Sequence, residues 1–262
     1  MYQRIRKRCA WILLLAIACL GPCLAVFAYD ELVEKKVFEM PSYTTVGNRT
    51  IKMVTMGYET FGKLGPNGDN VILITPFFGG TSHAAGKYRA DDPSLGYWDS
   101  LIGPDRPLDT NKFFVISVDG LANPDIKENT TVTTGPASTD PDTGKRYGMT
   151  FPIITIRDFV NVQKALVDHL GIKKIYAVMG ASMGAMQAFE WAAAYPEMVE
   201  RIVPVVGAAQ CDAFEIGRLE SWVAPIKLDP RWNNGDYYGK EEPAEGVKAA
   251  MKSVLLDTRH PG

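Results

Sequence analysis

The stretch KIYAVMGASMGAMQAFEWAAAYP, residues 174–196, predicts the fold of this chain. Its first part is a short apolar run, typical of a strand buried on both faces, and its second part is rich in residues that favour a helix. Ser182 stands where the two meet, between Gly180 and Gly184. A serine between two glycines at a strand-to-helix turn projects its hydroxyl above the sheet as a nucleophile. The alternative is a tight turn in which the glycines allow close packing and the serine caps the helix.

The segments around this stretch predict an α/β fold. TIRDFVNVQKALVDHLG, residues 155–171, predicts a helix that Thr155 and Asp158 open in capping-box spacing and Gly171 ends. RTIKMVTMGYETFG, residues 49–62, alternates in part and predicts antiparallel strands at an edge. Strands alternating with helices indicate a mostly parallel sheet with helices on both faces. Three more apolar runs predict further buried strands, at residues 69–75, 112–120 and 200–209.

Two backbone N–H groups are candidate donors to the negative oxygen that develops during acyl transfer. Met183, at the start of the predicted helix, is the first. The second is expected from the loop after the strand at 69–75, where the sequence TPFFGG places the backbone of Phe77 or Phe78. A glycine-rich turn without such a role is the alternative for this loop.

The acid and base that would activate Ser182 are not found in the sequence. His83 is interpreted as a surface or supporting group, and His169, in the last turn of a helix, as structural. After Ser182 the only histidine is His260, close behind Asp257, and no strand precedes it to hold it against the hydroxyl. We therefore expect no triad acid or histidine in these 262 residues.

Four stretches resemble the homoserine O-acetyltransferase family within the α/β-hydrolase fold. They are GYWDSLIGPDRPLDTNKFFVISVDGL (96–121), TTGPASTDPDTGKRYGMTFPIITIRDFVNVQKALVDHLGI (133–172), GASMGAMQAFEWA (180–192) and LDPRWNNGDYY (228–238). The resemblance implies that Ser182 takes an acyl group from a thioester and passes it to a hydroxyl acceptor. It also implies a helical lid that begins near residue 210, with the final strands of the fold missing.

Three features depart from that family. Its oxyanion loop is usually a His-Ala-Leu-Thr-Gly run, for which this chain has TPFFGG, with Phe78 nearest to the donor leucine. Its acceptor-binding arginine, six residues before an Asp-Pro pair, is replaced by Val223. This chain is expected to be exported, and acetyl-CoA and homoserine would both be scarce outside the cytoplasm. These departures favour hydrolysis of an ester or related acyl substrate over transfer from an acyl-CoA.

Residues 1–28 have the pattern of an export signal. RIRKR begins at Arg4, an apolar stretch follows, Gly21-Pro22 breaks it, and Val26 and Ala28 precede a cleavage site before Tyr29. The mature protein would then be periplasmic or secreted. An uncleaved N-terminal membrane anchor is the alternative, and lipid attachment at Cys19 or Cys23 is a weaker one.

Composition limits the partners. Without residues 1–28 the chain carries 24 basic and 30 acidic residues, a net charge of −6, which argues against a nucleic-acid partner. Cys211 is then the only cysteine, so an intramolecular disulfide is not expected, and no Cys/His spacing suggests a metal. We expect a small-molecule acyl substrate and no cofactor. The sequence is compatible with a homodimer.

The predicted organisation is an export signal at 1–28, an α/β-hydrolase core at 29–209 and an incomplete lid at 210–262. The predicted function is that of an exported serine-nucleophile enzyme, either a hydrolase or an O-acyltransferase. A truncated remnant without activity is the alternative. Missing strands would leave a sheet edge and an apolar face uncovered, and we expect such a chain to aggregate.

Overall fold

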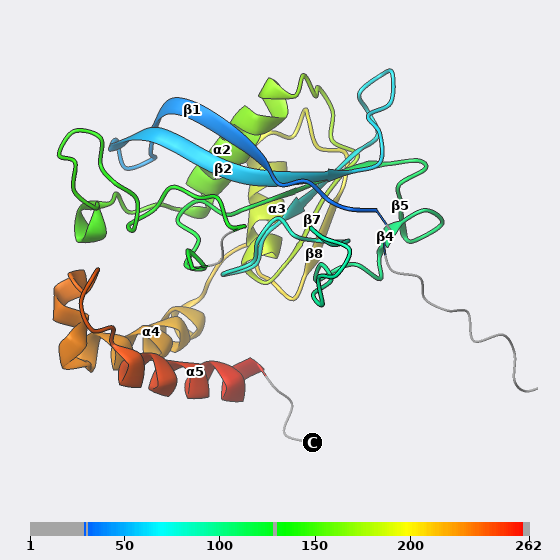
Figure 1. Cartoon of the computed structure of the whole chain (residues 1–262). Helices are drawn as coiled ribbons and strands as arrows, with labels where there is room; N and C mark the ends of the chain where they lie inside the picture. Colours follow the sequence, from blue (N-terminus) through cyan, green and yellow to red (C-terminus); the bar gives the residue numbers. More distant parts are fainter. Residues whose placement is uncertain (1–28, 30, 128–129, 259–262) are drawn as a thin grey trace, which may run out of the picture.

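The computed structural model describes residues 29, 31–127 and 130–258, so the predicted export signal and His260 lie outside the described residues. No helix in this described part is both long and apolar enough to cross a membrane. Figure 1 shows a twisted sheet with helices packed against it and a pair of helices at the C-terminal end. The strands are β1 (Lys36–Thr44), β2 (Thr50–Phe61), β3 (Val71–Thr75), β4 (Ile102–Gly103), β5 (Leu108–Asp109), β6 (Phe114–Val118), β7 (Ala177–Ala181) and β8 (Ile202–Val205). The helices are α2 (Ile156–His169), α3 (Met183–Ala194), α4 (Ala213–Leu228) and α5 (Ala244–Thr258), with 3-10 turns η1 (Gly148–Thr150) and η2 (Pro230–Gly235).

The main sheet has the strand order β1-β2-β6-β3-β7-β8. The pairs from β6 to β8 are parallel, and β1 and β2 add an antiparallel edge. The carboxyl ends of β3, β6 and β7 therefore lie along one edge of the sheet, which is where α/β folds bind their ligands. The predicted α/β class, parallel sheet and antiparallel edge are confirmed.

Helix α2 begins as the sequence predicts. Thr155 and Asp158 form a capping box, in which the Asp158 carboxylate accepts hydrogen bonds from the Thr155 N–H at 2.7 Å and its hydroxyl at 2.9 Å. Asp158 is fully buried and also accepts from the Tyr43 hydroxyl at 2.7 Å. Burial alone would raise the pKa of Asp158, but these hydrogen bonds hold it below its ordinary value. The cap thus ties α2 to strand β1.

Each face of the sheet has its own hydrophobic cluster. The larger cluster contains the buried sides of α2 and α3, including Leu166 and Trp191. The smaller cluster packs Phe61 and Ile74 against the irregular segment that runs from Ala84 to Leu108. In the described part of the chain, helices thus cover the larger cluster, and the irregular segment from Ala84 to Leu108 covers the smaller one.

Strand β8 differs from the expectation for residues 200–209. It is shorter, and its side chains alternate between half-buried and exposed instead of being buried on both faces. Val203 and Val205 are each 42% exposed, because β8 is the last strand of the described sheet and lacks a covering layer there. An uncovered apolar edge was predicted and is observed; aggregation stays a prediction.

The chain after β8 is helical, as expected for residues beyond 209. Helix α4 contains no buried residue and packs against α5, so the two form a helical pair beside the core (Figure 1). Asp229 joins them, because its carboxylate accepts hydrogen bonds from the N–H of Arg231 at 3.0 Å and of Gly246 at 3.0 Å. The domain boundary at 209/210 and the role of this pair as a lid stay predictions.

Candidate active site

Ser182 occupies a strained turn between β7 and α3. Its backbone angles are φ 56° and ψ −121°, a conformation that a residue with a side chain adopts only at a cost of about 1–3 kcal/mol. The backbone is held there because the Ser182 N–H donates to Val205 O at 3.0 Å and the Ser182 carbonyl accepts from Ala185 N at 2.9 Å. The side chain makes no capping hydrogen bond to α3, and the residue is exposed. The hydroxyl is therefore free for chemistry, which the capping alternative does not explain.

The two flanking glycines are needed because β3 lies against the turn. A Cβ at Gly180 would overlap Thr75 Oγ1 and lie 2.7 Å from Thr75 O. A Cβ at Gly184 would overlap the same Thr75 carbonyl. The Thr75 hydroxyl then donates to Gly184 O at 2.8 Å, which binds the end of β3 to the first turn of α3.

Gly184→Ala is expected to lower the free energy of unfolding by about 1–3 kcal/mol, because the added methyl group must displace the backbone of β3. Gly217→Ala in α4 is the matched control, since nothing lies within 4 Å of a Cβ there and alanine should raise helix stability. Urea unfolding of both variants measures the difference. Equal effects at the two positions would show that the contact with Thr75 does not constrain the turn.

The loop after β3 brings two more backbone N–H groups beside the turn. Phe77 O accepts from Gly80 N at 2.8 Å, and Gly79 has the positive φ of 74° that the third position of such a turn favours. Among the described residues, the N–H groups of Phe77, Phe78 and Met183 donate to no protein acceptor. Three amide donors are thus free near the candidate nucleophile. Phe78 is 71% exposed and Phe77 37%.

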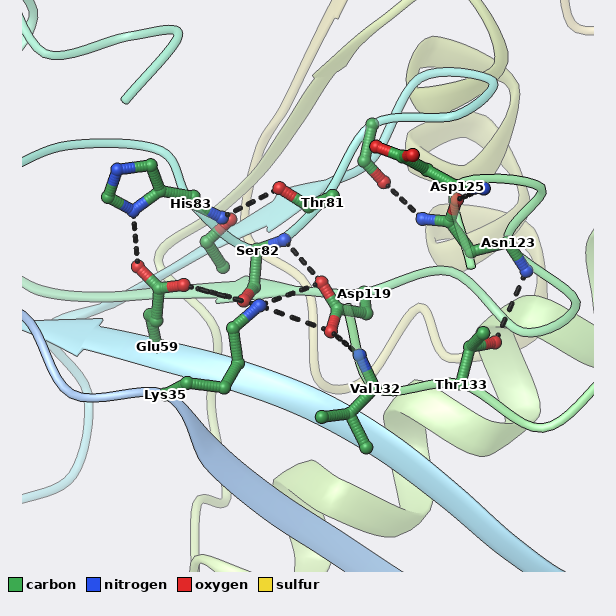
Figure 2. A network of polar contacts seen from close by, with 12 residues as sticks. Lys35, Glu59, Thr81, Ser82, His83, Asp119, Asn123, Asp125, Val132 and Thr133 are labelled. Carbon is green, nitrogen blue, oxygen red and sulfur yellow. Dashed lines mark hydrogen bonds and ion pairs between the residues drawn. The ribbon is translucent and has the colours of Figure 1, made fainter. Parts of the chain in front are cut away.

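A buried ionic cluster anchors the far end of this loop (Figure 2). Glu59 of β2 and Asp119, directly after β6, are both fully buried, and Lys35 lies between them with its Nζ 3.1 Å from Asp119 Oδ1 and 3.4 Å from Glu59 Oε1. Ser82 in the loop donates its N–H to Asp119 at 2.6 Å and its hydroxyl to Glu59 at 2.9 Å. The cluster therefore joins the loop to two strands and to the N-terminal segment.

The charge of Lys35 is what allows two carboxylates to share this interior. Burial raises the pKa of Glu59, but its contact with His83, the charge of Lys35 and the hydroxyl of Tyr88 together hold the pKa below its ordinary value. Glu59 is thus kept ionised and fully bonded.

The histidines do not complete a catalytic triad in the described residues. His83 Nδ1 lies 3.2 Å from Glu59 Oε2, and its ring stacks on Tyr88 at 4.3 Å between centroids. Glu59 belongs to β2, three strand spacings or about 14 Å from β7, so His83 supports the loop and does not contact Ser182. His169 is exposed at the end of α2 and lies beside Phe38, as its structural interpretation implies.

The C-terminal candidates also lie elsewhere. Asp257 is part of α5, not of a loop after a strand, and its carboxylate accepts from Trp222 Nε1 at 2.7 Å. Val223, at the place of the family's arginine, lies in α4 and is partly exposed. The described residues thus supply a candidate nucleophile and free amide N–H groups, with no histidine bonded to Ser182.

Several residues of this site escaped the sequence analysis. Lys35, Glu59, Ser82 and Asp119 are distant in sequence, and only the pairing of β2 with β6 brings them together. Gln187 was also missed. A glutamine in a helix is expected at the surface, but Gln187 is fully buried. A polar residue on the apolar side of α3 was the available signal.

Comparison with known proteins agrees with this geometry. A family model described as the alpha/beta hydrolase fold matches residues 94–261. Homoserine O-acetyltransferase from Carboxydothermus hydrogenoformans is 45% identical over 225 residues, covering 86% of this chain and 58% of the relative.

Two solved structures are also similar. Esterase E22 superposes with a TM-score of 0.85 at 54% identity, over 88% of this chain and 62% of that one. Homoserine O-acetyltransferase from Bacillus anthracis superposes with a TM-score of 0.83 at 43% identity, over 86% of this chain and 60% of that one.

The chain spans about half the length of the curated relatives it matches, with 58%, 41% and 43% for three of them. The match to the family model covers more than half of this chain, and it includes the β7–α3 turn that carries Ser182. The chain belongs to the alpha/beta hydrolase fold family and, within it, resembles the homoserine O-acetyltransferases.

Proposed function

We propose that the protein is a serine enzyme that transfers an acyl group through an acyl-Ser182 intermediate, with water as the usual acceptor. The observation that carries the proposal is the Ser182 turn, where an exposed, uncapped hydroxyl follows a parallel strand in a strained backbone conformation. That strain is retained although glycine would relieve it, which is typical of a functional position.

The chemistry has two steps. The Ser182 oxygen attacks the acyl carbon of an ester, and collapse of the tetrahedral intermediate releases the alcohol and leaves an ester on Ser182. Water then attacks this ester, which frees the acid and restores the hydroxyl. In each step the amide N–H of Met183 and one N–H from the loop at Phe77 and Phe78 stabilise the negative oxygen. Proton transfer needs a base that the described residues do not place at Ser182.

Two observations favour hydrolysis over transfer to homoserine. The chain is 54% identical to esterase E22 over 88% of its length, and 43% identical to the homoserine O-acetyltransferase from Bacillus anthracis over 86% of its length. In addition, Val223 stands where that family's acceptor-binding arginine is expected. A neutral, partly exposed valine offers no charge to hold the carboxylate of an amino-acid acceptor.

The proposal includes export to the periplasm or the exterior, which rests on the sequence pattern of residues 1–28. Water is the abundant acceptor there. A small ester is accordingly the substrate class that we propose, with no cofactor.

The test compares two reactions of the protein expressed from its complete reading frame. We expect hydrolysis of p-nitrophenyl acetate at an enzyme-like rate, and acetylation of homoserine by acetyl-CoA at less than a tenth of that rate. Faster acetylation of homoserine would make the protein a transferase. Absence of both activities would favour the inactive remnant.

A further inference from the structure

A chain of buried amides connects the helix after Ser182 to the loop after β3. Trp191 Nε1 donates to Gln163 Oε1 at 2.8 Å, and Gln163 Nε2 donates to Gln187 Oε1 at 2.6 Å. Gln187 Nε2 in turn donates to Pro76 O at 2.8 Å and to Met183 O at 3.2 Å. Trp191 and Gln187 are completely buried and Gln163 nearly so. Every polar atom of the Gln187 side chain is therefore used.

The orientation of the Gln187 amide is fixed by its partners. Its oxygen accepts from Gln163, so its nitrogen faces the two carbonyl groups. A flipped amide would place its oxygen against the carbonyl oxygens of Pro76 and Met183, where all three atoms only accept. A buried network that is satisfied in one arrangement holds its members rigidly.

The contact with Pro76 O determines the direction of one free N–H. Pro76 O and the N–H of Phe77 belong to the same planar trans peptide, so they point in opposite directions. Holding the carbonyl on the buried side of the loop turns the Phe77 N–H toward the opposite side. The same amide also bonds Met183 O in the first turn of α3, so it ties the loop to the residue that carries the other free N–H. The Met183 N–H itself belongs to the preceding peptide, whose carbonyl, Ser182 O, accepts from Ala185 N at 2.9 Å.

We propose that Gln187 is a positioning residue that sets the direction of the Phe77 N–H and its spacing from the first turn of α3, so that the Phe77 and Met183 N–H groups act as one oxyanion hole. The inference rests on the proposed acyl transfer, and it assigns the second donor to Phe77 instead of the Phe78 expected from the sequence.

The rest of the loop is held independently. Asn123 Nδ2 donates to Gly80 O at 2.8 Å, and Ser82 N donates to Asp119 at 2.6 Å. The short segment of Phe77, Phe78 and Gly79 thus lies between the Gln187 contact and the buried ionic cluster. Loss of the Gln187 contact is expected to shift the Phe77 peptide locally without unfolding the loop.

The test is Gln187→Met in the protein expressed from its complete reading frame, because methionine fills a similar volume and donates no hydrogen bond. We expect kcat for p-nitrophenyl acetate to fall about 10- to 100-fold with KM within twofold, since the lost alignment acts on the transition state. The Ki of a trifluoromethyl ketone, which forms a tetrahedral alkoxide on a serine nucleophile, should rise by a similar factor.

Gln163→Met is the matched control. It removes two buried hydrogen bonds in the same amide chain but leaves the two carbonyl groups that orient Gln187. We expect a comparable loss of thermal stability, with kcat and the ketone Ki within threefold of wild type. Equal losses of kcat in the two variants, or an unchanged kcat in Gln187→Met, would overturn the proposal.

Gln187→Glu is the second variant, and it applies even if Gln187→Met folds poorly. A protonated carboxyl of the same length can donate to Pro76 O, whereas an ionised one cannot. Its rate relative to wild type should therefore rise as the pH falls, and a ratio independent of pH would contradict the inference. If Ser182→Ala leaves ester turnover intact in an otherwise wild-type chain, the proposed function fails separately.

Discussion

Ser182→Ala is expected to reduce kcat/KM for p-nitrophenyl acetate by about 10⁴- to 10⁶-fold, because the proposed acyl-enzyme forms on the Ser182 hydroxyl. Ser221→Ala is the control, since this exposed serine of α4 only donates to the Arg218 carbonyl at 2.6 Å. Steady-state kinetics of both variants, expressed from the complete reading frame, measure the effect. A fluorophosphonate probe should label the wild type and Ser221→Ala but not Ser182→Ala. Labelling that persists in Ser182→Ala would mean that another residue is the nucleophile.

The same position separates function from stability. Alanine at residue 182 keeps the strained φ of 56°, so its free energy of unfolding should match wild type. Ser182→Gly relieves the strain, worth about 1–3 kcal/mol, against a smaller entropic cost of glycine in the unfolded chain. An inactive glycine variant that is at least as stable as wild type would show that the backbone at Ser182 is kept for chemistry. A less stable one would contradict the strain argument.

Lys35→Met is expected to lower the free energy of unfolding by about 3–5 kcal/mol, because it leaves the buried carboxylates of Glu59 and Asp119 without their cation. The side chain of Lys35 is only 11% exposed, so water cannot replace the charge. Urea unfolding at pH 8 measures the loss. Lys52→Met is the matched control, since the ion pair of Lys52 with Asp142 is exposed on both sides and should contribute little to stability.

The pH dependence identifies the cause. In the wild type the pKa of Glu59 is below its ordinary value, so this group stabilises the fold above about pH 4.3, and the contribution is lost as pH falls through the folded pKa. Lys35→Met removes one of the groups that offset burial, beside His83 and Tyr88, so we expect the pKa of Glu59 to rise and the ionised carboxylate to oppose folding as pH rises. The difference between wild type and Lys35→Met should therefore narrow between pH 8 and pH 5. A constant difference would mean that Lys35 stabilises by packing alone.

The sequence alone determined the class of fold and the strand-to-helix turn that holds Ser182, the candidate nucleophile. Local rules suffice for these features, because a buried strand, a glycine-flanked serine and a helix are read from consecutive residues. The capping box of Thr155 and Asp158 was predictable for the same reason. The burial of residues 200–209 was not predictable, because an apolar run does not reveal whether a neighbouring layer covers it.

Only the tertiary structure decided which contacts hold the loop after β3 and the first turn of α3. The ionic cluster joins Lys35 to Asp119 across 84 positions of the chain, and Gln187 reaches Pro76 across 111. Such contacts depend on the order of strands in the sheet and on which side of a helix faces inward, and no local pattern encodes either. In the oxyanion hole that we propose, the choice between Phe77 and Phe78 likewise depends on which carbonyl a buried amide holds. Consecutive residues thus determine the turn that presents Ser182, and long-range packing determines the direction of the backbone groups around it.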